Sequence, residues 1–148
     1  MMEVIPESIQ HAVYVHAQPP DVYAAFTTAQ GLDGWFTSGA EVDPRPGGSI
    51  RFRWKDWGPL NVTAEDGGPV LEATPSRRFV FQWRPDTIRY FTTVELQFKP
   101  AQGGTQVSLR EYGYQNTPTG LRSMLNCATG WGAALTLLKF YVEHGRHD

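Results

Sequence analysis

Residues 117–145 read TPTGLRSMLNCATGWGAALTLLKFYVEHG, and this stretch decides the fold. Apolar side chains recur in it at steps of three and four residues, the spacing of one face of an α-helix. They are Leu121, Met124, Leu125, Ala128, Trp131, Leu135, Leu138 and Val142. The pattern predicts one long helix over residues 117–144, ending at Gly145, with a continuous apolar face. Such a face has to be buried against another layer of the protein.

The residues before this helix alternate between apolar and polar side chains, which is the period of β-strands. The alternation is clearest in residues 50–55, where Arg51, Arg53 and Lys55 form a solvated cationic face. Strands are predicted at residues 8–16, 40–43, 50–55, 78–83, 88–99 and 105–114, with one or two more in residues 60–74. Residues 56–59 are expected to form a loop, and residues 66–69 either a hairpin or a bulge.

Two short helices are predicted after the first strand, over residues 20–28 and 30–36. Gly31 and Gly34 weaken the second. The long C-terminal helix is the only element able to cover the apolar face of the sheet. We therefore predict an α+β helix-grip fold, in which a curved antiparallel sheet of six to seven strands wraps around that helix. Residues 1–148 are expected to form one domain.

Composition excludes several classes of protein. Hydrophobic residues make up 41% and charged residues 19%, a balance that predicts a soluble globular chain. A net charge of -2 argues against nucleic acid or an anionic membrane as partner. Cys127 is the only cysteine, and the first residues lack a secretory signal, so we expect a cytoplasmic location. No metal-ligand spacing, phosphate loop or dinucleotide motif occurs, so we expect no metal and no cofactor.

The order and spacing of several short motifs resemble a known family. These motifs are the Pro-Pro-Asp-Val start of the first short helix, residues 31–36, 46–48, 70–80 and 103–105, and the pair Gly130-Trp131. Over residues 11–143 the chain resembles the activator of heat-shock protein 90 ATPase homologue-like branch of the START-like (SRPBCC) superfamily. The resemblance implies a helix-grip fold, but fold alone does not specify function. Members include lipid and hormone binders, aromatase-cyclases, antibiotic-sequestering proteins, toxin-like regulators and co-chaperones. Residues 55–59 depart from the usual glycine turn.

Candidate ligand-binding residues lie on the predicted inner face of the sheet and on the C-terminal helix. They are Phe52, Trp54, Phe81, Trp83, Tyr90, Glu111, Trp131 and Leu135. For most of the aromatic side chains on the sheet we favour a role in filling the core, with Trp54, Trp83 and Tyr90 nearest to a cavity.

Two features leave alternatives open. Glu111 falls on the apolar side of its strand, so it is either a buried polar anchor or general base, or a strand-end residue that a bulge turns to water. We favour the bulge. Gly130 and Gly132 flank Trp131, and they either leave cavity volume beside the indole or let the helix approach the sheet closely. Here we favour the close approach.

Three functions compete. The first is noncatalytic binding of a small apolar or aromatic molecule between helix and sheet. The second is a cyclase- or hydrolase-type enzyme in the same cavity, with Glu111 or a tyrosine moving protons. Only one inward carboxylate is predicted, so no catalytic residue is assigned and binding ranks first. The third is a protein-interaction or co-chaperone-like module, for which Trp57 could form an exposed patch. A homodimer is left open.

Overall fold

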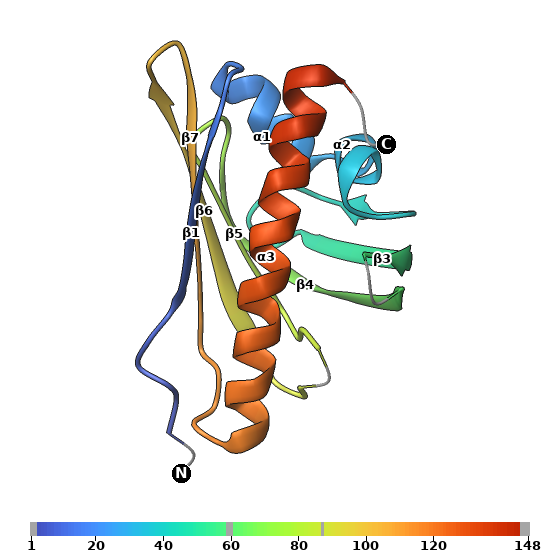
Figure 1. The fold of residues 1–148 in the computed structure, drawn as a ribbon, viewed down its shortest axis with the longest axis vertical. Coiled ribbons are helices and arrows are strands. Elements are labelled where there is room, and N and C mark those ends of the chain that lie inside the picture. The colour runs from blue at the N-terminus through green and yellow to red at the C-terminus, as the bar shows by residue number, and fades with distance from the viewer. Residues whose placement is uncertain (1–2, 59–60, 87, 146–148) are drawn as a thin grey trace.

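The computed structural model describes residues 3–58, 61–86 and 88–145, in which seven strands form one antiparallel sheet (Figure 1). In chain order the strands are β1 (Ile9–Val15), β2 (Glu41–Val42), β3 (Ser49–Trp57), β4 (Val62–Thr74), β5 (Arg78–Trp83), β6 (Thr92–Ala101) and β7 (Gly104–Tyr112). Their order across the sheet is β1-β7-β6-β5-β4-β3-β2. Two short helices, α1 (Pro19–Thr27) and α2 (Ala29–Trp35), follow β1, and α3 (Pro118–His144) ends the described chain. The predicted α+β helix-grip fold is confirmed.

The long helix α3 has a defined start and stop. The Thr117 hydroxyl accepts a hydrogen bond from the Gly120 N–H at 2.9 Å, which satisfies one of the free donors of the first turn. Gly145 ends the helix in the left-handed conformation, with φ of 67°. In Figure 1, α3 crosses one face of the sheet, with α1 and α2 beside its C-terminal half. None of the helices in the described ranges is long and apolar enough to cross a membrane.

The apolar face of α3 is shorter than the sequence predicts. Trp131, Leu135 and Leu138 are buried, but Leu121 and Leu125 are 48% and 60% exposed. Successive helical residues are turned by about 100°, so Leu125 lies about 120° around the axis from Trp131. Steps of three and four residues therefore carried the predicted stripe off the buried face in the first two turns.

The sheet bends where β4 passes from one partner to the other. Its first half pairs with β3 and its second half with β5, and the register with β5 shifts between Val70 and Glu72. A Cβ atom on Gly67 or Gly68 would lie within 2.3 Å of a neighbouring strand's carbonyl oxygen, so both positions need glycine. The hairpin expected at residues 66–69 is therefore wrong: these residues are the interior of one long strand, and the irregularity of the bulge alternative lies just beyond them, between Val70 and Glu72. Of the predicted strand at residues 60–74, residue 60 lies outside the described residues.

Two of the strand ends that differ from prediction show a local irregularity. β3 continues to Trp57, where a loop was expected over residues 56–59, because a bulge between Trp54 and Trp57 keeps it paired with β4. Pro59 lies outside the described residues. β6 begins at Thr92, four residues later than expected, and the Ile88 N–H donates a hydrogen bond to the Pro85 carbonyl oxygen instead of to a neighbouring strand.

Candidate ligand cavity

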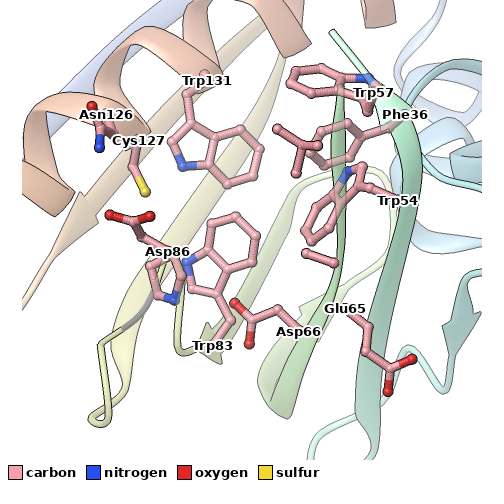
Figure 2. A pocket seen from close by; sticks show the side chains of 14 residues that line it. Phe36, Trp54, Trp57, Glu65, Asp66, Trp83, Asp86, Asn126, Cys127 and Trp131 are labelled. Carbon is pink, nitrogen blue, oxygen red and sulfur yellow. The ribbon is translucent and has the colours of Figure 1, made fainter. Parts of the chain in front are cut away.

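A cavity of about 370 Å³ lies between α3 and the part of the sheet formed by β3, β4 and the end of β5. Its walls come from the end of α2, from β3, β4 and the end of β5, and from the middle of α3 (Figure 2). The lining residues are Phe36, Trp54, Trp57, Val62, Ala64, Glu65, Asp66, Trp83, Pro85, Asp86, Asn126, Cys127, Gly130 and Trp131. Space of this size fits a small organic molecule.

Phe36, Trp54, Trp83 and Trp131 each contact two others of the four, so that they form a closed circuit around the cavity. We call these four side chains, together with Trp57, the aromatic wall. The ring centroids are 5.2 Å apart for Trp83 and Trp131, 6.0 Å for Trp131 and Phe36, 5.4 Å for Phe36 and Trp54, and 6.2 Å for Trp54 and Trp83. Trp57 packs edge-on against Phe36 at 5.6 Å. In Figure 2, Trp83 and Trp131 face Trp54, Trp57 and Phe36 across the cavity.

Glu111 lies behind this wall rather than in the cavity. It is fully buried, and it pairs without a break with Ile9 of β1 and Val94 of β6, so the favoured bulge at this position is wrong. Its Oε2 accepts hydrogen bonds from Trp83 Nε1 at 2.8 Å and from the Thr92 hydroxyl at 2.6 Å. Its Oε1 accepts one from Trp131 Nε1 at 3.0 Å. The carboxylate therefore fixes two indoles that come from different layers of the fold.

Burial dominates the electrostatics around Glu111. Loss of hydration raises the pKa of its carboxyl group, although the donors from Thr92, Trp83 and Trp131 act in the opposite direction. Tyr114 is buried nearby with no hydrogen bond to its hydroxyl group. Burial, and then the charge of Glu111, raise the pKa of that hydroxyl. The same two causes raise the pKa of the Cys127 thiol to about 12, so Cys127 is a poor nucleophile at neutral pH.

Asp66 is the most enclosed carboxylate in the cavity lining. Its Oδ1 accepts backbone hydrogen bonds from Gly67 at 2.7 Å and from Arg84 at 3.0 Å. Its Oδ2 is buried and has no hydrogen-bond partner, and burial raises the pKa of the group. Asp86 also lines the cavity, and its Oδ2 accepts a hydrogen bond from the Ser123 hydroxyl at 2.9 Å.

The two glycines beside Trp131 have different surroundings. A Cβ atom on Gly130 would meet no atom within 4 Å, and Gly130 lines the cavity. A Cβ atom on Gly132 would lie 3.3 Å from the His11 ring. His11 Nε2 is also 2.8 Å from the Ala128 carbonyl oxygen and so joins β1 to α3. The favoured close approach therefore holds for Gly132 but is wrong for Gly130, which leaves cavity volume.

The structure divides the sequence-predicted candidate residues into two groups. Trp54, Trp83 and Trp131 line the cavity. The other five lie outside its lining: Phe52, Phe81 and Leu135 are buried in the core, Glu111 holds the indoles, and the Tyr90 hydroxyl accepts a hydrogen bond from the Gln115 N–H at 3.0 Å.

The lining residues that the sequence did not predict lie mainly on the side of the cavity formed by the end of α2 and by β3 and β4. Phe36 caps α2, Trp57 was expected in a loop, and Asp66 belongs to the segment expected to form a hairpin or a bulge. Trp54 and Trp57 are three residues apart, so only the bulge brings both to the cavity. The departure from the family pattern at residues 55–59 was the one available signal. Across the described ranges, no three His, Cys, Asp or Glu side chains gather as a metal site would require.

Comparisons with known proteins agree with this architecture. The solution structure of the Aha1 dimer from Colwellia psychrerythraea is 23% identical, covers 94% of this chain and 98% of that chain, and has a TM-score of 0.75. Protein CV1439 from Chromobacterium violaceum is 24% identical over 94% and 99% of the two chains, with a TM-score of 0.76. CalU16 from Micromonospora echinospora is 21% identical over 97% and 83%, with a TM-score of 0.72.

At these identities the solved structures show the shared fold. A search of the curated proteins found no significant match. The sequence model of one family, described as "Activator of Hsp90 ATPase homolog 1-like protein", matches residues 16–143, which is most of the chain. The predicted resemblance is confirmed, and the chain belongs to the Activator of Hsp90 ATPase homolog 1-like family.

Proposed function

We propose that this protein binds a small apolar or aromatic molecule in the cavity between α3 and the sheet. The observation that carries the proposal is an open space of about 370 Å³ with an aromatic wall. Small-molecule sites are concave and are lined mainly by apolar and aromatic side chains, and this space, bordered by four tryptophans, has that character. Gly130 supports the same conclusion, because its missing side chain leaves the space open at a cost in helix stability.

A catalytic role in the same cavity has less support. Glu111 is separated from the cavity by the indoles it holds, so it does not reach a bound molecule. Cys127 does line the cavity, but its raised thiol pKa leaves little thiolate at neutral pH. The lining carboxylates, Glu65, Asp66 and Asp86, are not accompanied by a basic partner among the lining residues that the structure describes. Binding without turnover is the function that the side chains favour.

A protein-interaction role based on Trp57 also loses support, because Trp57 is half-buried against Phe36 and lines the cavity. We expect a homodimer as an additional property, since the Colwellia relative was solved as a dimer. Light scattering on the purified protein measures this directly, and a monomeric mass at all concentrations would contradict it. The cytoplasmic location expected from Cys127 stays a prediction.

The binding proposal is tested by native mass spectrometry of the purified protein with a panel of apolar and aromatic metabolites. A Gly130→Leu variant fills the cavity with a side chain and should lose binding. The matched control is Ala133→Leu, which adds the same side chain to the exposed side of the same helical turn and should keep it. If no compound binds the wild type, or if both variants bind equally, the proposal is wrong. Conversion of a bound compound would favour the enzyme instead.

A further inference from the structure

The cavity has an unbalanced charge. Glu65, Asp66 and Asp86 contribute three carboxyl groups to it, whereas no lysine or arginine is among the lining residues that the structure describes. Glu65 is neutralised outside the cavity by ion pairs with Arg51 and Arg53, and in Figure 2 its carboxylate points away from the aromatic wall. Asp86 is exposed to solvent and accepts a hydrogen bond from Ser123, so the unbalanced negative charge inside the cavity belongs to Asp66.

Asp66 is poorly compensated by the protein itself. Both of its backbone donors serve Oδ1, so the buried Oδ2 is left without a hydrogen bond. Arg84 is the cation that acts on it, but the Arg84 guanidinium is placed over the Phe91 ring, 5.1 Å from its centroid. A buried acceptor with no partner is costly, and a ligand that donates a hydrogen bond or carries a positive charge would remove that cost.

The aromatic wall suits a positive charge as well. Indole faces carry negative electrostatic potential, and tryptophan is the best of the aromatic residues at attracting an organic cation. The Trp83 ring lies 6.2 Å from the Trp54 ring and 5.2 Å from the Trp131 ring, so a cation beside Trp83 would contact more than one ring. Ring faces and a carboxylate on one side of a largely apolar space are the recognised means of binding an ammonium group with an apolar body.

We infer that the ligand of this cavity is an organic cation, an amine or quaternary ammonium compound with an apolar or aromatic body, whose charge lies between the indoles and Asp66. This inference rests on the proposed binding function and specifies the chemical class of the ligand. A neutral hydrocarbon of the same shape would fill the space but would leave Asp66 Oδ2 unpaired.

The test uses two probes of matching shape, phenyltrimethylammonium and its neutral isostere tert-butylbenzene. Binding is followed in the intact protein through the indole N–H signals in ¹H–¹⁵N spectra. We expect the cation to bind about tenfold more tightly than the isostere, which is the order of a desolvated cation–π contact with an added charge. Sodium chloride should weaken binding of the cation and not that of the hydrocarbon, because salt screens only the former.

Two variants separate the contributions. Asp66→Asn keeps the side-chain shape and an acceptor for the two backbone donors. It should lower the affinity for the cation about fivefold or more and leave the affinity for the neutral isostere unchanged. Trp54→Leu should lower the affinity for both probes, because both contact the aromatic wall.

Equal or tighter binding of tert-butylbenzene would overturn the inference, as would an Asp66→Asn variant that binds the cation normally. If neither probe binds at millimolar concentration, the cation inference is also overturned. The binding function itself would then still stand if the metabolite panel yields a neutral ligand that Gly130→Leu excludes.

Discussion

Replacing Gly130 by alanine tests whether the cavity is kept open at the expense of stability. Alanine is favoured over glycine inside a helix by about 1 kcal/mol. The new methyl group would meet no atom within 4 Å, so no steric cost offsets this gain. We therefore expect Gly130→Ala to raise the free energy of unfolding by about 1 kcal/mol, or the midpoint temperature by about 2–4 °C. Affinity for cavity ligands should fall, because the methyl group lies where they bind.

Gly132→Ala is the matched control, two residues further along the same helix. The gain in helix propensity is the same, but the methyl group would lie 3.3 Å from the His11 ring. That ring has to move, and its 2.8 Å contact with the Ala128 carbonyl is a hydrogen bond worth about 1 kcal/mol. Gain and loss should cancel, with ligand affinity unchanged. Urea unfolding and a binding titration of both variants decide the matter. Equal stabilisation by the two substitutions, or unchanged affinity in Gly130→Ala, would refute the reasoning.

Other predictions concern the polar groups around the cavity. Glu111→Gln places an amide NH₂ against at least one indole N–H, so it should cost about 1–3 kcal/mol in urea unfolding, and a variant of wild-type stability would contradict the hydrogen-bond assignment. The raised pKa of Asp66 means that the folded state binds the Asp66 proton more tightly than the unfolded state does. The contribution of Asp66 to stability is therefore full below the ordinary pKa of about 4, and it is lost as the pH rises through the raised value. The unfolding free energy of the wild type minus that of Asp66→Asn should therefore decrease with pH above about 4, and a flat difference would be inconsistent with a raised pKa. Cys127, with its thiol pKa near 12, should react with iodoacetamide at pH 7.5 far more slowly in the folded protein than in urea, and equal rates would show that the thiol is not shielded.

The regular elements were predictable because their signals are local. The alternation in residues 50–55 and the capping residues Thr117 and Gly145 depend on neighbours in the sequence, and they placed the main part of β3 and both ends of α3 correctly. The exposed Leu121 and Leu125 were not predictable in this way, since a stripe spaced by three and four residues can drift around the helix axis, and only the packing of the helix on the sheet decides which of its residues are buried.

The cavity was predicted less well, because its wall depends on contacts between distant residues. Trp54, Trp83 and Trp131 were found from strand alternation and helix spacing. Trp57 reaches the wall only through a bulge, and a bulge breaks the alternation that sequence reasoning relies on. Whether Gly130 opens space depends on what lies opposite it, which a single helix does not specify.

Glu111 explains how an aromatic cavity can stay open instead of collapsing. Trp83 comes from β5 and Trp131 from α3, and each has its indole N–H fixed to one oxygen of the same buried carboxylate. Rotating either ring into the empty space would break a charge-assisted hydrogen bond and leave a buried donor and acceptor unpaired. The wall is therefore held in place before any ligand arrives, which reduces the ordering cost of binding. A residue first considered as a ligand contact thus acts from behind the wall, by holding the rings that a ligand would meet.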